Sequence, residues 1–221
     1  MQQSSVQSTI PFSHLHILSA GADAKSDSFM ERIKGMNEYL LVIHPDDEVY
    51  NKVIAEKQGF YDQYRQKISV KAKPYITVAN FMAREEMEQT LIRWIQRVSS
   101  LQKCFPVTLN NYSGFPPHTI YLRILDHQPF KQLATQLKVI NSYIISNGCP
   151  AVQFLRWPHM AIARQLPDNV YEKAAIDYSQ KTFCESFTVH ELILLRRAHQ
   201  FDECKVVNIF RLLPGENNLF N

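Results

Sequence analysis

The sequence predicts an α+β fold in which the strands form antiparallel sheets. Strand-like and helix-like segments alternate in the first half of the chain, and strand-like segments then come in pairs. This order is typical of α+β proteins and not of doubly wound parallel sheets. The 221 residues include only six glycines and no glycine-rich phosphate loop, which argues against a dinucleotide-binding or P-loop fold. A chain of this length suits one domain or two closely packed lobes.

The composition is that of an ordinary globular protein. A net charge of +3 allows an anionic ligand without requiring one. No apolar run approaches the roughly 18–20 residues of a membrane span, and the N-terminus lacks the pattern of a secretory signal. We therefore expect a cytoplasmic protein without a membrane segment. The four cysteines form no CxxC pair and lack zinc spacing to histidines, so we expect no metal and mostly buried, reduced thiols.

Local patterns place the elements of the first half. Residues 1–35 are rich in Gln, Ser and small residues, which predicts a polar N-terminal extension ahead of a domain at 36–221. The apolar run 38–44 ends before Pro45 and predicts a buried strand. Asp46 and Asp47 then favour the start of a helix, because carboxylates complement its N-terminal dipole. The following patterns predict a strand at 73–81 and a helix at 84–101.

The second half contains more strands than helices. Two strand-like runs, 105–112 and 118–125, flank a turn at 113–117 and predict a hairpin. The remaining elements are expected to be a helix at 130–145, a strand at 158–164, a helix at 170–183, and two antiparallel strands at 187–196 and 205–212.

A short internal repeat suggests two related halves. Pro74-Tyr75-Ile76-Thr77-Val78-Ala79 aligns with Pro158-His159-Met160-Ala161-Ile162-Ala163 at an offset of 84 residues (159 − 75). Alternate side chains of a strand share a face, so Tyr75 and Thr77 point the same way. A duplicated pair of lobes would bring the two segments together about a pseudo-twofold axis. We therefore expect two pseudo-symmetric lobes, each an antiparallel sheet backed by helices, with a central cleft between them.

These segments resemble the strand motifs of the 2H phosphoesterase superfamily, which includes the bacterial 2'-5' RNA ligases. In that family each lobe carries His-Φ-(Thr/Ser)-Φ, where Φ is apolar; residues 75–78 and 159–162 stand at these positions. The segments 115–121 and 186–189 are also similar, so the resemblance covers about residues 38 to 213. It implies a 2'-5' RNA ligase-like, cyclic phosphodiesterase-like fold. It also implies partners that are RNA or nucleotides with a phosphodiester or cyclic phosphate, without a metal or organic cofactor.

The motifs depart from the family pattern at two of four positions. In the family, two histidines serve as base and acid on one phosphodiester, and two hydroxyls stabilise its charge. Here the first histidine is Tyr75 and the second hydroxyl position is Ala161, whereas Thr77 and His159 remain. The resemblance thus implies catalytic roles for His159 as principal acid–base group, for Thr77 as phosphate donor, and for Tyr75 as a substituted partner.

The departures predict impaired or altered activity. A phenol has an unperturbed pKa near 10 and is a poor base at neutral pH. The lost hydroxyl costs roughly 10²–10³ in rate, and the lost acid–base group roughly another 10²–10⁴.

Further residues are candidates for binding the substrate, beside Ala161 itself. Lys73 and Arg164 flank the motifs, and the planar fork of arginine suits phosphate. Arg164 stands at an odd offset from His159, so it leaves the His159 face unless the strand ends there. Tyr112 and Phe115, beside the hairpin turn, could stack a base, although solvated charge and hairpin packing are the commoner uses of such residues.

Three functions remain open from the sequence. The first is an enzyme acting on RNA or nucleotide phosphodiesters, and the second is a module that binds a nucleotide or RNA without turnover. The third is an interaction scaffold with a vestigial cleft. The sequence leaves the oligomeric state open.

Overall fold

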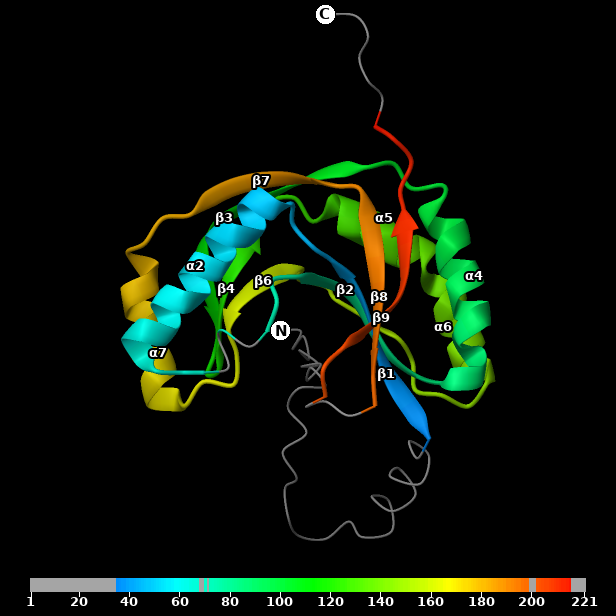
Figure 1. Ribbon diagram of the computed structural model, residues 1–221, viewed down its shortest axis with the longest axis horizontal. Helices are drawn as coiled ribbons and strands as arrows, with labels where there is room; N and C mark the ends of the chain where they lie inside the picture. The colour runs from blue at the N-terminus through cyan, green and yellow to red at the C-terminus, as the bar shows by residue number, and fades with distance from the viewer. Residues whose placement is uncertain (1–34, 68–69, 71, 199–201, 216–221) are drawn as a thin grey trace, which may run out of the picture. The chain divides into compact units, whose positions relative to one another are not determined.

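The computed structural model describes residues 35–67, 70, 72–198 and 202–215 (Figure 1). The predicted N-terminal extension, residues 1–35, lies outside these ranges except for Gly35. The described part confirms the α+β prediction. None of its helices combines the length and the apolarity that crossing a membrane requires.

The strands form one curled antiparallel sheet. Their order across it is β7-β3-β4-β6-β2-β1-β8-β9, and the short β5 also pairs with β2. The strands are β1 Met36–Ile43, β2 Ile76–Arg84, β3 Phe105–Phe115, β4 Thr119–Ile124, β5 Gln153–Phe154, β6 His159–Ala163, β7 Cys184–Val189, β8 Glu191–Arg197 and β9 Lys205–Arg211.

The sheet consists of two four-stranded halves that meet where β2 pairs with β6. The two strands pair at Ile76 and Met160, which are equivalent positions of the sequence repeat. The two copies of the repeat therefore pair with each other, as a twofold axis requires. The predicted lobes exist as halves of one continuous sheet, and not as two separate sheets.

Helices cover one face of each half (Figure 1). Helices α2 (Asp47–Tyr64) and α7 (Asp168–Ser179) pack on the half that contains β3, β4 and β6. Helices α4 (Glu88–Ser99), α5 (Gln128–Gln136) and α6 (Lys138–Ser146) lie at the other half, with the 3-10 turn η2 (Glu85–Met87) before α4. The start of α2 is the predicted one, because the Asp46 side chain accepts a hydrogen bond from the Val49 amide at 2.9 Å.

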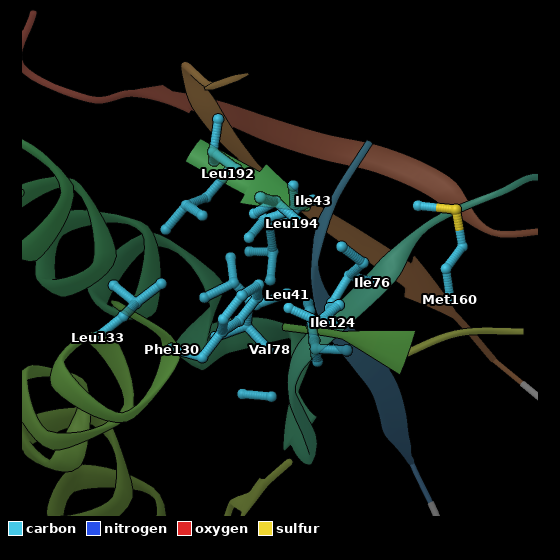
Figure 2. Packing of buried hydrophobic residues seen from close by; sticks show 14 of the residues in the cluster. Leu41, Ile43, Ile76, Val78, Ile124, Phe130, Leu133, Met160, Leu192 and Leu194 are labelled. Carbon is cyan, nitrogen blue, oxygen red and sulfur yellow. The ribbon is translucent and has the colours of Figure 1, made fainter. Parts of the chain in front are cut away.

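The main core lies between the helices and one face of the sheet. Figure 2 shows strand residues such as Leu41, Ile76 and Met160 packed together with Phe130 and Leu133 of α5. A small second cluster lies on the other face; it contains Leu40, Val42, Ile193 and Leu195, with Tyr75 and Cys204 packed against it. Side chains alternate along a strand, so each strand contributes to both faces.

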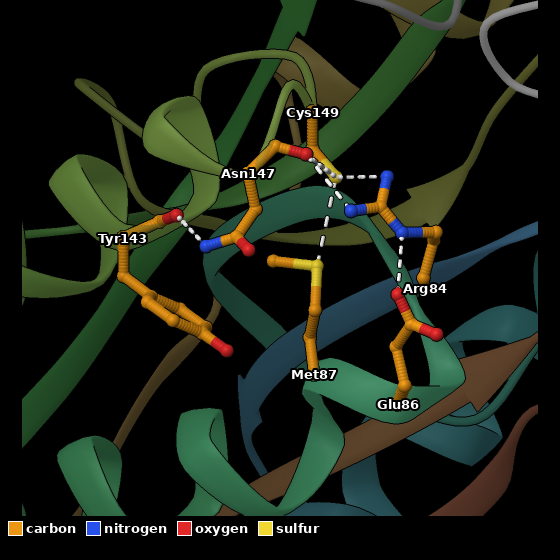
Figure 3. Close-up of polar contacts among 6 residues, drawn as sticks. All are labelled: Arg84, Glu86, Met87, Tyr143, Asn147 and Cys149. Carbon is orange, nitrogen blue, oxygen red and sulfur yellow. Dashed lines mark hydrogen bonds and ion pairs between the residues drawn. The ribbon is translucent and has the colours of Figure 1, made fainter.

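Polar contacts tie the end of β2 to the end of α6 (Figure 3). Arg84 donates hydrogen bonds to Glu86 at 2.9 Å and to the Asn147 carbonyl at 3.0 Å. The buried thiol of Cys149 lies beside the Met87 sulfur at 3.7 Å. The four cysteines are all free, but Cys149 alone among them is buried, so the expectation of mostly buried thiols was wrong.

Two predicted elements are divided in the structure. The helix expected at 130–145 is interrupted at Leu137, between α5 and α6. The strand expected at 187–196 is interrupted at His190, so that β7 pairs with β3 in one half while β8 pairs with β1 in the other. Apolar residues stand on both sides of the polar pair His190-Glu191, and for this reason the segment resembled one strand in the sequence.

Candidate functional site

The four motif positions lie on the face of the sheet opposite the helices. Ile76 and Met160 point into the main core. In an antiparallel pair the residues on either side of such a pair also face one another, which puts Thr77 by His159 and Tyr75 by Ala161. Neighbours along a strand point to opposite faces. The repeat therefore brings all four motif side chains to one surface, which we call the motif face.

The hydrogen bond of His159 determines its tautomer. Its Nδ1 lies 2.9 Å from the Trp157 carbonyl oxygen. A carbonyl can only accept, so Nδ1 carries the proton and Nε2 of the neutral ring keeps its lone pair. Burial lowers the pKa of His159 to about 4; the bond to Trp157 opposes this shift and the positive charge of Arg164 adds to it. His159 is therefore a neutral base at pH 7.

This pKa predicts a stability change with pH. Between about pH 4 and the ordinary histidine value of 6.5, the unfolded chain binds a proton at His159 that the folded chain does not. The free energy of unfolding therefore falls as the pH is lowered through this window. The lowered pKa of His44 acts in the same direction. We expect His159→Gln to make the loss between pH 7 and pH 5 smaller by about 1–2 kcal/mol, measured by urea unfolding. The exposed His190→Gln is the control, and an unchanged loss in His159→Gln would contradict the assignment.

The Tyr75 ring contacts both Arg164 and His44. The Arg164 guanidinium carbon is 5.6 Å from the centre of the Tyr75 ring, and the His44 ring is stacked at 6.3 Å. Strand β6 ends at Ala163, so Arg164 is free of the strand alternation and reaches the motif face. From the sequence we expected Arg164 to leave the His159 face unless the strand ended before it, and the strand does end before it.

The other two motif positions are buried but differ in chemistry. Thr77 is 7% exposed, and its hydroxyl makes no hydrogen bond to any other described residue. Ala161 is 8% exposed and offers only a methyl group. One hydroxyl is thus available for a ligand at this surface instead of two.

The remaining candidates are divided between surface and core. Lys73 is exposed; burial lowers the pKa of His44, and the positive charge of Lys73 adds to this shift. Phe115 is 38% exposed, with its ring 5.0 Å from that of His159. Tyr112 was wrong as a base-stacking candidate: it is 8% exposed and packs edge-on against Tyr178, 4.9 Å away. An irregularity in the β3–β4 register between Leu109 and Tyr112 changes the alternation, so that Tyr112 faces the core as Leu109 does.

The structure forms a pocket whose lining the sequence showed only in part. A pocket of about 260 Å³ lies beside His159; its lining is Phe115, Tyr121, Arg123, Ile124, His127, Trp157 and Pro158. Tyr121 and Arg123 reach the motif face because β4 pairs with β6, with Arg123 opposite His159. The pairing of β4 with β6 cannot be read from the spacing of residues in the sequence. Tyr75 and Thr77 do not line the pocket. The pocket therefore lies next to the motif positions and does not contain them.

The chain is similar to proteins of one family. Residues 45–200 match the model of the 2'-5' RNA ligase superfamily, and no curated protein matches the sequence. Among solved structures, TT0787 of Thermus thermophilus has a TM-score of 0.60 at 17% identity, over 80% of this chain and 97% of that one. E. coli LigT complexed with 3'-AMP has a TM-score of 0.57 at 15% identity, over 80% and 98%. A protein described as a phosphoesterase has a TM-score of 0.58 at 16% identity, over 80% and 98%.

Proposed function

Because the chain belongs to the 2'-5' RNA ligase superfamily, we propose that its motif face binds RNA or nucleotide phosphodiesters and processes them slowly. The observation that carries this proposal is the pairing of Ile76 with Met160, which gathers the motif positions of both halves on one surface. Structures of E. coli LigT hold 3'-AMP and ATP, which supports a nucleotide ligand.

Thr77 and Arg164 are the groups that bind the phosphate. The Thr77 hydroxyl has no partner among the described residues and donates to a nonbridging oxygen. The Arg164 guanidinium, above the Tyr75 ring, supplies the positive charge. A hydrogen bond to a charged group contributes about 1.5–3 kcal/mol. Arg164 thus takes over part of the stabilisation that Ala161 does not provide.

His159 and Tyr75 divide the proton transfers. In hydrolysis of a 2',3'-cyclic phosphate, His159 Nε2 takes a proton from the attacking water while the water oxygen bonds to phosphorus. The bond from phosphorus to one ribose oxygen breaks, and the Tyr75 phenol gives that oxygen its proton. His159 is free to take this proton because it is neutral at pH 7, and its lowered pKa makes it a weak base, which slows the step.

Tyr75 is a weak proton donor in this pair. The unperturbed pKa of a phenol, near 10, makes it a poorer proton donor than an imidazolium. The missing hydroxyl at Ala161 removes one hydrogen bond from the transition state. We therefore propose measurable binding with slow turnover. A module that binds without turnover differs from this proposal only in rate, whereas a scaffold with a vestigial cleft would bind no nucleotide.

Binding of 3'-AMP tests the proposal. We expect Thr77→Val and Arg164→Gln each to weaken 3'-AMP binding by about 10-fold, because each removes one hydrogen bond to the charged phosphate. Isothermal titration calorimetry gives the dissociation constants. Adenosine, which lacks the phosphate, should bind equally to the wild type and both variants.

Two matched substitutions serve as controls. Thr188→Val removes an exposed hydroxyl from the edge strand β7, and Arg93→Gln removes an exposed guanidinium from α4. Both should bind 3'-AMP as the wild type does. If 3'-AMP and adenosine bind equally well, or if Thr77→Val and Arg164→Gln leave 3'-AMP binding unchanged, the proposal is wrong.

A further inference from the structure

The pocket beside His159 is walled by aromatic rings. Trp157 is 65% exposed, and the His127 ring packs edge-on against it at 5.7 Å. Phe115 is stacked on Tyr121 with ring centres 4.4 Å apart. Large apolar side chains at an open surface mark binding sites, and exposed rings offer a flat platform to a planar ligand.

The pocket adjoins the proposed phosphate site. Pro158 is in its wall and directly precedes His159, whose ring lies 4.9 Å from that of Tyr121. A volume of about 260 Å³ is below the roughly 300 Å³ at which pockets for drug-sized ligands begin. The pocket therefore suits a single ring system attached to a group that is bound at His159.

Arg123 gives the pocket a directional polar group. Its Nε donates to the Asn110 carbonyl at 3.2 Å, which anchors the guanidinium. Its two terminal amino groups make no hydrogen bond to another described residue. No carboxylate is among the described residues that line the pocket. Two parallel donors in an apolar surrounding match a ligand with two acceptors on one edge.

We propose that this pocket holds the guanine base of a nucleotide whose phosphate lies at the motif face, with Arg123 as the specificity-determining residue. Guanine presents O6 and N7 as adjacent acceptors, whereas adenine presents N7 beside the N6 amino donor. The Arg123 fork pairs with the first edge and is mismatched with the second. Trp157 supplies the stacking surface. The placement of the phosphate rests on the proposed function; the base preference rests on the pocket.

Affinities for three mononucleotides test the preference. We expect 3'-GMP to bind the wild type about 10-fold more tightly than 3'-AMP. Inosine 3'-monophosphate keeps O6 and N7 and should bind like 3'-GMP. Arg123→Met, which removes the guanidinium without adding a group that pairs with adenine, should remove the preference while leaving 3'-AMP binding within about twofold, and Arg93→Met should leave the preference intact. Trp157→Ala should weaken both 3'-GMP and 3'-AMP by about 10-fold, since it removes the stacking surface.

The two tryptophans allow the ligand to be placed independently. Trp94 lies on α4, packed against the main core, and Trp157 lies in the pocket. In Trp94→Phe, 3'-GMP should quench the fluorescence that remains, and in Trp157→Phe it should not. Quenching that persists in Trp157→Phe would place the base elsewhere and overturn the proposal.

The results separate this inference from the proposed function. Equal affinities for 3'-GMP and 3'-AMP, with both weakened by Thr77→Val, would overturn the guanine pocket and leave phosphate binding intact. A loss in Arg123→Met that is equal for both nucleotides would make Arg123 a phosphate ligand and also overturn it. Guanosine binding that depends on Arg123, with no effect of Thr77→Val or Arg164→Gln on 3'-GMP, would support the pocket and contradict the phosphate site.

Discussion

Replacing Tyr75 by histidine is expected to raise the kcat for hydrolysis of a nucleoside 2',3'-cyclic phosphate by about 10²–10⁴. The substitution returns an imidazole to the position that the register puts beside Ala161 and next to Thr77. An imidazolium gives up its proton to the leaving oxygen more readily than a phenol does. Adding Ala161→Thr should contribute roughly another 10²–10³ by restoring a transition-state hydrogen bond. Product formation measured by chromatography under saturating substrate gives kcat.

A tyrosine outside the site provides the control for this gain. Tyr61→His on α2 makes the same chemical change at a partly exposed helix position and should leave kcat unchanged. Circular dichroism and calorimetric 3'-AMP binding establish that Tyr75→His is folded and binds nucleotide. A variant that meets both conditions and shows no gain would contradict the asymmetric acid–base pair.

Phe60→Ala is expected to lower the free energy of unfolding by about 3–5 kcal/mol. The Phe60 ring is fully buried in α2, 4.6 Å from Tyr64 and 5.5 Å from Tyr178. Its removal leaves a cavity between α2 and α7. Domain stabilities are typically about 5–15 kcal/mol, so the loss is a large part of the total. Urea unfolding at pH 7 measures it.

An exposed residue of the neighbouring helix α7 provides the control for Phe60→Ala. Ile176 on α7 is 68% exposed, so Ile176→Ala should change the free energy of unfolding by less than about 0.5 kcal/mol. Similar losses in Phe60→Ala and Ile176→Ala would show that the core does not lie between α2 and α7.

The sequence predicted most elements because local chemistry determines them. The Asp46 cap, the apolar run at residues 38–44 and the hairpin turn at 113–117 are signals within a few residues. The division of the predicted strand at His190 depends instead on which neighbours β7 and β8 pair with. That is a property of the whole sheet, and no local period reveals it.

The candidate site was predictable where it coincides with the repeat. Tyr75, Thr77, His159 and Ala161 were named because two short segments align with each other and resemble a family motif. Arg123 was not foreseen, because its place at the motif face depends on the pairing of β4 with β6. Tyr112 was misassigned because a turn-proximal aromatic residue has the same sequence pattern whether it faces the core or the ligand.

The most direct test of the central claim, that both halves act on one phosphate, is the cyclic phosphodiesterase activity of Tyr75→His with and without His159→Ala. If both residues serve the same phosphorus atom, the gain from Tyr75→His requires His159. The double variant should then fall to the kcat of His159→Ala alone, and the effects should be strongly non-additive. A double variant that keeps the full gain would show that residue 75 acts independently of His159, and the account of a shared site would be wrong.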